Sequence, residues 1–276
     1  MIINFFKILR PSNLFITAIC ILLSGSIFNQ LTVSILPIMM VILLLGGFSN
    51  IINDLFDYKI DQENNIRRPI ASNQISFRFA FIFACLLLLI AILIIFYYNF
   101  NELTKSLILF INLPLIILYT PIFKKIPLIG NLVIAFILGM VFVVTTAYLN
   151  ENILVILPPS ILAFLLMLIR EIVKDIADIS GDTKFNINTL PVRFGINIAF
   201  NVIICIFVIL LLISIYFFNL YNLQYFISLL ILVIFPLIYY LYQFSKNKTS
   251  TYCIYLSKVL KLITIFGVIV IYLANI

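Results

Sequence analysis

The chain has 276 residues, of which 64% are hydrophobic and only 10% are charged, and its mean hydropathy is +1.26. Soluble domains carry about half apolar and roughly 25% charged residues, so this composition excludes an ordinary soluble enzyme, a disordered chain and a secreted disulfide scaffold. The formal net charge of +7 is typical of membrane topology signals and does not by itself indicate nucleic acid. We therefore expect an all-α, polytopic membrane protein with no nucleic-acid partner.

Nine segments are long and apolar enough to cross a bilayer, since a spanning helix needs about 20 mainly apolar residues. In chain order they are residues 12–29, 34–53, 77–98, 105–123, 127–149, 156–177, 196–218, 223–244 and 253–275. The alternating pattern of barrel strands is absent, so we predict helices. Pro158 and Pro159 are expected in the first turn of the sixth helix, where no amide is needed. The first segment resembles a signal peptide, but further spans follow it, and we expect it to be retained as an anchor.

The basic residues predict the orientation of the spans. Every Lys and Arg except Lys105 falls on the side that holds the N-terminus and the loops after the even-numbered spans. That side should be cytoplasmic, which places the C-terminus outside. Of the acidic residues, only Glu102 and Glu151 fall on the opposite side. A transporter would need ionisable groups near the midplanes of its spans, so these charges instead predict chemistry at the cytoplasmic face of the cell membrane.

The lack of His and the positions of the cysteines narrow the possible chemistry further. The chain has no His, which excludes His-ligated metals and a His general base. Its cysteines, Cys20, Cys85, Cys205 and Cys253, lie far apart inside apolar runs. We interpret them as small hydrophobic residues and not as a disulfide or metal-binding set.

Two aspartate trios share one spacing, at the ends of the second and sixth spans. They are Asp54, Asp57 and Asp61, and Asp175, Asp178 and Asp182. Spacings of three and four place each trio on one helical face, unless the helix ends early and Asp61 or Asp182 reaches the site from a loop. Like charges on one face repel, and Mg²⁺ bound by carboxylates and a substrate phosphate would relieve that repulsion. The trios share their spacing, each follows an apolar helix, and a proline comes shortly after each, which suggests two similar four-helix halves plus a ninth helix. We predict a single domain, residues 1–276.

Basic residues beside the trios indicate the ligand. Together with carboxylates and Mg²⁺, Lys and Arg side chains form a clamp for diphosphate. The candidates are Lys59, Arg67, Arg68, Lys124, Lys174, Lys184 and Arg193. Six acidic groups in paired trios have no purpose in a purely structural membrane protein, so the pattern favours an enzyme of phosphate-containing substrates.

The motifs resemble those of the UbiA superfamily of intramembrane prenyltransferases over nearly the whole chain. Asn53 with the first trio matches the family's Asn-Asp-x-x-Asp-x-x-x-Asp signature, and the second trio matches its Asp-x-x-Asp-x-x-x-Asp signature. Three further segments are similar to family motifs: Arg10-Pro11-Ser-Asn13, Arg67-Arg68-Pro69, and Tyr119 to Lys124 followed by Gly130-Asn131. Several members space that Tyr and Lys by four residues, whereas here the spacing is five, so Lys125 is an alternative to Lys124.

The resemblance implies a Mg²⁺-dependent site. All six aspartates would hold the metal, with Asp54, Asp57, Asp175 and Asp178 as the catalytic residues. The candidate substrate-binding residues are Asn53, Arg67, Arg68, Tyr119, Lys124, Lys125, Asn131, Lys174 and Lys184. In such a site Arg68 and Lys124 would neutralise the diphosphate. Glu171, an outer aspartate and the released pyrophosphate remain candidates for the base.

The acceptor is the finer question. The segment from Arg170 to Asp182, followed by Thr189-Leu190-Pro191, is most similar to archaeal members that move geranylgeranyl from its diphosphate to the hydroxyl of geranylgeranylglyceryl phosphate. The alternative acceptor is an aromatic quinone precursor such as 4-hydroxybenzoate. A transporter and a CDP-alcohol phosphotransferase are the rival classes, and the Asp-Gly-x-x-Ala-Arg signature of the latter is missing. We expect lipid-phosphate and prenyl-diphosphate substrates, a surrounding bilayer and no obligate protein partner.

Overall fold

The computed structural model describes residues 2–63 and 68–274, and in these ranges helices joined by turns and loops make up the chain, without strands. It divides into two compact units. The first comprises residues 1–122 and 141–153, and the second comprises residues 123–140 and 154–276. The all-α fold expected from the sequence is confirmed, whereas the single-domain organisation and the similarity of the two halves stay predictions.

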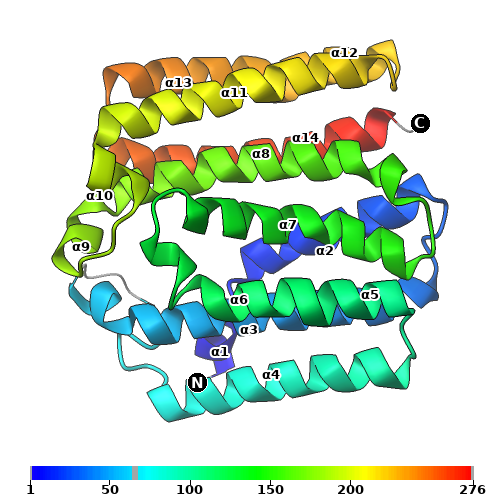
Figure 1. Ribbon diagram of the computed structural model, residues 1–276, viewed down its shortest axis with the longest axis horizontal. Helices are drawn as coiled ribbons and strands as arrows, with labels where there is room; N and C mark the ends of the chain where they lie inside the picture. The colour runs from blue at the N-terminus through cyan, green and yellow to red at the C-terminus, as the bar shows by residue number, and fades with distance from the viewer. Residues whose placement is uncertain (1, 64–67, 275–276) are drawn as a thin grey trace. The chain divides into compact units, whose positions relative to one another are not determined.

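The first unit is built from the N-terminal helices (Figure 1). Its elements are α1 (Ile2–Ile8), α2 (Pro11–Ile27), the short η1 (Val33–Ile35), α3 (Leu36–Glu63), α4 (Phe77–Tyr97), α5 (Glu102–Ser106), η2 (Leu107–Asn112), α6 (Leu113–Tyr119) and the last part of α7 (Ile129–Tyr148). Helices α3 and α4 pack side by side, and α2 and α6 also contact α3. The long helix α3 is therefore the centre of this unit.

The second unit contains the remaining helices. Its elements are η3 (Phe123–Lys125), the first part of α7, α8 (Ile153–Ala177), α9 (Ile179–Lys184), α10 (Leu190–Phe194), α11 (Ile196–Phe218), α12 (Leu223–Leu229), η4 (Leu230–Ile234), α13 (Phe235–Lys246) and α14 (Ser250–Ala274). Here α7 and α8 approach closely, because Gly139 has no side chain and the Ser160 hydroxyl donates to the Gly139 carbonyl at 2.9 Å. The short helices α9 and α10 lie at the end of the unit where α8 finishes and α11 begins (Figure 1).

Eight helices in the described residues are long and apolar enough to span a bilayer. The remaining predicted span, residues 12–29, corresponds to α2, which has 17 residues, or about 26 Å of helix. This is slightly short of the roughly 30 Å hydrocarbon core, so the predicted count of nine is not confirmed. Large apolar side chains such as Phe79, Phe110 and Leu212 are exposed along the spans. Such exposure suits lipid contact, since the bilayer is as apolar as these side chains.

In three spans, the backbone near the prolines differs from the regular helices expected from the sequence. Helix α8 begins at Ile153, so Pro158 and Pro159 lie inside it and not in its first turn. In the fourth and eighth predicted spans the π-helical segments η2 and η4 end just before Pro114 and Pro236. Proline has no amide to donate, and a widened turn accommodates the missing hydrogen bond. Hydropathy does not detect such a turn, because its residues remain uniformly apolar.

Candidate functional site

The first aspartate trio lies on one continuous helix. Because α3 runs to Glu63, Asp54, Asp57 and Asp61 all lie on its last turns, on one face. They are only 2%, 5% and 3% exposed. Burying three carboxylates on one face is costly without nearby positive charge, so the surroundings of this face determine what it can bind.

Two guanidinium groups supply that charge. Arg68 Nη1 lies 3.2 Å from Asp54 Oδ1, 3.8 Å from Asp57 Oδ2 and 2.8 Å from Asp61 Oδ2. Arg10 Nη2 donates to the same Asp54 oxygen at 2.5 Å. All three carboxylates therefore converge on one cationic nitrogen, and Asp54 is shared by two cations.

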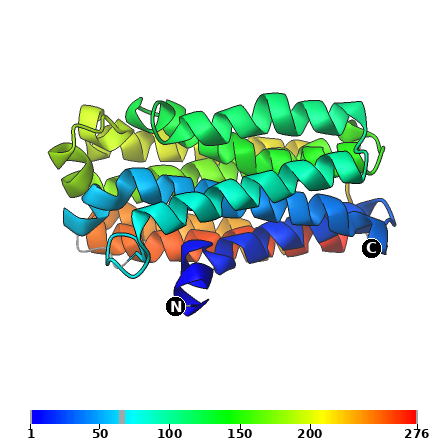
Figure 2. The same ribbon diagram turned by 90° about the horizontal axis from the view of Figure 1, so that it is seen from below.

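A hydrogen bond joins the segment before α2 to α3, one turn before the trio. Asn50, one turn before Asp54, donates to the Leu9 carbonyl at 2.9 Å, and Leu9 packs against Gly47. Arg10 has a left-handed backbone (φ 53°) where the chain turns between α1 and α2 (Figure 2). The sequence identified Arg10 as part of an opening motif but not as a partner of Asp54, because no local pattern links residues so far apart.

Asn53 lies on the neighbouring face of α3. Its Oδ1 accepts a hydrogen bond from the buried Thr120 hydroxyl at 3.2 Å, which joins α3 to the end of α6. Tyr119, the preceding residue, is half-buried. The hydrogen bond orients the Asn53 amide beside Asp54, and Thr120 is a residue that the sequence analysis did not single out.

The second trio does not lie on one helix. Asp175 is on α8, which ends at Ala177, and Asp178 is the exposed residue that connects α8 to α9. Asp182 lies on α9 and is buried. The expectation of a single helical face is therefore wrong here. The helix breaks at Asp178, and Asp182 reaches its place from a second, short helix.

Neutral donors hold the second trio. The Asn131 amide donates to Asp175 Oδ2 at 2.7 Å, and the Thr189 hydroxyl donates to Asp182 Oδ2 at 3.3 Å. Glu171, Lys174 and Asp182 are the charged neighbours of Asp175. The predicted residue Asn131 therefore contacts an aspartate of the second trio. Thr189 was noted in the sequence only as part of a segment similar to a family motif.

Gly130 brings the Lys124 backbone close to Asn131. A Cβ at this position would lie 3.0 Å from Lys124 Cα and 3.0 Å from the Phe123 carbonyl oxygen. We therefore expect Gly130→Ala to displace η3 and to lower kcat/KM by about tenfold, since small misplacements of binding groups are costly. The matched control is Gly267→Ala, whose Cβ would meet only Leu166 at 3.5 Å. Equal activities of the two variants, measured by product formation in detergent, would contradict this role.

A buried ionic network precedes Asp175 on α8. Arg170 Nη1 donates to Glu171 Oε1 at 2.8 Å, and Lys174 Nζ donates to Glu171 Oε2 at 2.6 Å. Arg170 Nε also donates to the Ser257 carbonyl on α14 at 3.3 Å. Both oxygens of Glu171 are thus engaged by cations, and the network ties the end of α8 to α14.

The other predicted cations are less embedded. Lys124 is half-buried on η3, and Lys125 and Lys184 are exposed. Arg67 lies outside the described residues. Exposed lysines on flexible stems can move toward a bound phosphate, so their positions are compatible with the predicted roles without assigning them.

The first trio fits a hydrated divalent cation. Among the described residues no three acidic or cysteine side chains are gathered closely enough to bind one bare metal ion. Even so, the three carboxylate oxygens lie 2.8, 3.2 and 3.8 Å from one Arg68 nitrogen. Direct Mg²⁺–oxygen contacts are about 2.0–2.1 Å, and Mg²⁺ usually keeps several waters. The observed spacing therefore suits an ion that retains water, or a bare ion after a small contraction of the trio.

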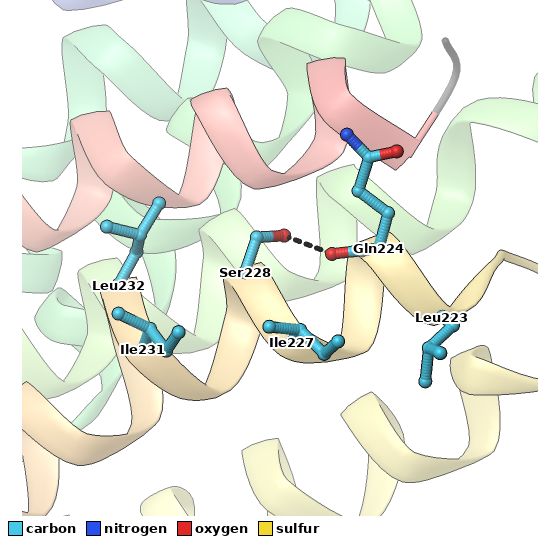
Figure 3. A pocket seen from close by; sticks show the side chains of 6 residues that line it. All are labelled: Leu223, Gln224, Ile227, Ser228, Ile231 and Leu232. Atoms are coloured by element: carbon cyan, nitrogen blue, oxygen red, sulfur yellow. Dashed lines mark hydrogen bonds between the residues drawn. The ribbon is translucent and has the colours of Figure 1, made fainter.

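A separate pocket lies on α12 and η4 and contains none of the predicted site residues (Figure 3). Its lining consists of Leu223, Gln224, Ile227, Ser228, Ile231 and Leu232. The Ser228 hydroxyl already donates to the Gln224 carbonyl at 2.8 Å. The remaining surface is almost wholly apolar and open, as expected of a helix face that contacts lipid, so this pocket has no groups for prenyl-transfer chemistry.

Known proteins are similar to this chain in sequence and in fold. Residues 13–270 match the UbiA prenyltransferase family. The digeranylgeranylglyceryl phosphate synthase of Methanosphaera stadtmanae is 31% identical over 268 residues, covering 94% of both chains. That of Methanobrevibacter smithii is 30% identical over 263 residues, covering 89% of this chain and 91% of the relative.

Solved structures give the same result. A structure described as digeranylgeranylglyceryl phosphate synthase in membranes aligns with a TM-score of 0.75 at 25% identity, covering 99% of this chain and 98% of the other. A UbiA homologue from Archaeoglobus fulgidus bound to DMAPP and Mg²⁺ aligns with a TM-score of 0.73 at 18% identity, covering 97% and 99%. The UbiA-type fold is therefore confirmed. This multi-pass membrane protein belongs to the UbiA prenyltransferase family.

Proposed function

We propose that this enzyme transfers a geranylgeranyl group from geranylgeranyl diphosphate to the hydroxyl of geranylgeranylglyceryl phosphate, in archaeal ether-lipid synthesis. The observation that carries the proposal is the convergence of Asp54, Asp57 and Asp61 on a single cation within a buried site. Relatives at about 30% identity that align over nearly their full length are named digeranylgeranylglyceryl phosphate synthases. Their names support this choice of acceptor over an aromatic one.

Both aspartate trios are proposed to bind Mg²⁺. UbiA homologues of the same fold hold Mg²⁺ together with DMAPP or GPP, and the convergent carboxylates of the first trio are suitable ligands. The proposed metal ligands are Asp54, Asp57, Asp61, Asp175, Asp178 and Asp182. Asn131 would orient Asp175 through the hydrogen bond described above, and Asn53, which Thr120 holds in place, would support the first trio.

Cationic side chains would bind the diphosphate. Arg68 and Lys124 are proposed to contact it directly, with Arg67, Lys125, Lys174 and Lys184 as further phosphate ligands and Tyr119 beside the reacting carbon. Guanidinium groups suit this task because they donate two parallel hydrogen bonds to phosphate oxygens. These assignments extend the family motif residue by residue and are testable by substitution.

The reaction follows from charge. Mg²⁺, when bound, stabilises the negative charge that the diphosphate gains as the allylic carbon–oxygen bond breaks. Arg68 and Lys124 act in the same direction on the departing oxygens. Apolar helices exclude water, so the allylic cation reacts with the acceptor hydroxyl instead of being hydrolysed. Because Glu171 is engaged by Arg170 and Lys174, an aspartate or the released pyrophosphate is the better proton acceptor.

The orientation is part of the proposal. The N-terminus and the aspartate motifs would face the cytoplasm, and the C-terminus would lie outside, because of the asymmetry of Lys and Arg among the loops. Both substrates are lipids with charged head groups, so they would enter from the bilayer. The function requires neither a protein partner nor nucleic acid.

An acceptor competition tests the function. Detergent-purified protein is incubated with geranylgeranyl diphosphate and Mg²⁺, with geranylgeranylglyceryl phosphate and 4-hydroxybenzoate offered in parallel. Mass spectrometry should detect the diether phosphate, and EDTA should abolish its formation until Mg²⁺ is returned. A prenylated 4-hydroxybenzoate without diether would replace the acceptor, and activity that survives EDTA would overturn the metal assignment.

A further inference from the structure

Arg68 contacts every carboxylate of the first trio. One guanidinium nitrogen lies within 4 Å of all three carboxylates, and its nearest partners are Asp61 at 2.8 Å and Asp54 at 3.2 Å. Arg68 itself is 28% exposed, whereas the carboxylates are almost fully buried. A more accessible cation thus covers a buried anionic face of α3.

Without such a cation, burial of this face of α3 would be unfavourable. Buried like charges on successive helical turns repel one another, and their loss of hydration adds to the cost. Arg10 relieves this at Asp54, where it shares Oδ1 with Arg68. Asp57 and Asp61 form ion pairs with Arg68, so Arg68 is the cation common to the whole trio.

Arg68 and a metal ion cannot occupy the point of convergence together. A divalent ion bound by the same oxygens would take the position of Nη1, and two cations there would repel. We propose that Arg68 is a positioning residue with two alternating partners. It holds the trio together in the substrate-free enzyme, and it moves to the diphosphate when a divalent cation takes the carboxylate oxygens. This inference rests on the proposed function.

The local backbone permits such a movement of the side chain alone. Ser72 N donates to the Arg68 carbonyl at 2.9 Å, and Gln74 N and Ile75 N donate to the Pro69 carbonyl at 2.9 and 3.1 Å. The turn that follows Arg68 is therefore fixed, while the long side chain can swing about its own torsions. Arg10 pairs with Asp54, and the Asn50–Leu9 hydrogen bond anchors the residue before it to α3. Arg10 stays with Asp54 while Arg68 exchanges.

The test is divalent-ion binding by the substrate-free, full-length protein in detergent. Binding of Mn²⁺, followed by the loss of the free-ion signal in electron paramagnetic resonance, should be at least about tenfold tighter in Arg68→Gln, because a competing charge near three carboxylates is removed. Arg78→Gln is the matched control, since Arg78 is an exposed arginine at the start of α4. Arg68→Lys should remain close to the unsubstituted protein, because its charge still competes.

Two further measurements separate this role from a merely structural one. Adding Asp57→Asn to Arg68→Gln should abolish the gain in Mn²⁺ affinity, which assigns it to the first trio. In EDTA, Arg68→Gln should unfold at a lower temperature than the unsubstituted protein, and Mg²⁺ should remove this difference in unfolding temperature. Arg68→Gln should also raise the KM for prenyl diphosphate.

Unchanged or weaker Mn²⁺ binding in Arg68→Gln would overturn the proposal, as would an equal gain in Arg78→Gln. Failure to detect Mn²⁺ binding to any of the proteins would overturn it too. In each of these cases, EDTA-sensitive prenyl transfer by the unsubstituted enzyme would show that the proposed function stands, whereas its absence would show that both fail.

Discussion

Replacing Asp57 or Asp178 by asparagine is expected to lower the rate of prenyl transfer by about 100-fold or more, since each change removes a proposed, charged metal ligand while preserving shape. The folded fraction should not fall. Asp57 has like-charged neighbours on its own helical face, and Asp178 is exposed, so neither change leaves an unpaired buried charge. The measurements are initial rates at saturating Mg²⁺ and the helical signal in circular dichroism.

The controls for this pair lie in a charged cluster at the start of α5. Glu102 accepts from Lys105 at 3.0 Å, and the Glu102 side chain is 89% exposed. Glu102→Gln and Lys105→Ala should leave activity unchanged, because exposed pairs contribute little. Near-normal rates in either aspartate variant would remove that residue from the metal site. A large loss in Lys105→Ala would overturn the predicted topology.

Glu171→Gln is expected to cause the largest loss of stability, about 3 kcal/mol. The Glu171 and Arg170 side chains are 7% and 15% exposed, so the substitution removes the carboxylate partner of a largely buried guanidinium. Lys174 is 38% exposed and can turn toward solvent, which limits its share of the cost. Thermal unfolding of the detergent-solubilised protein, followed by circular dichroism, should show the lower midpoint.

A second variant separates charge from packing at this site. Arg170→Met combined with Glu171→Met removes both buried charges and should recover part of the lost stability, because replacing a buried pair by apolar groups is often neutral. If the double variant is less stable than Glu171→Gln, the hydrogen bond from Arg170 to Ser257 on α14 outweighs the ion pair.

Much of the fold could be predicted because its signals are local. Helix positions follow from apolar runs of about 20 residues, and the predicted limits of most spans agree with the helices within a few residues. The common face of Asp54, Asp57 and Asp61 follows from helical spacing, and α3 continues far enough to include all three. Membership of the UbiA family was indicated by the paired signatures and is shown by the family match.

Local patterns failed where hydrogen bonding changes within a uniform stretch of sequence. The π-helical turns before Pro114 and Pro236 and the entry of Pro158 into α8 leave the hydropathy unchanged. The break at Asp178 could not be predicted from spacing either. The second trio has the same spacing as the first, but its helix ends before Asp178.

The amino-acid sequence by itself determined the membrane class, the helices, the two aspartate motifs and the kind of ion that they suit, since these depend on composition and on spacings within one helix. Only the tertiary structure decided which partner each aspartate has. Arg10 reaches Asp54, and Asn131 reaches Asp175, each across 44 residues of chain. Such pairs form when packed helices bring distant side chains into hydrogen-bonding distance, and the energy that selects them comes from the burial of the whole unit.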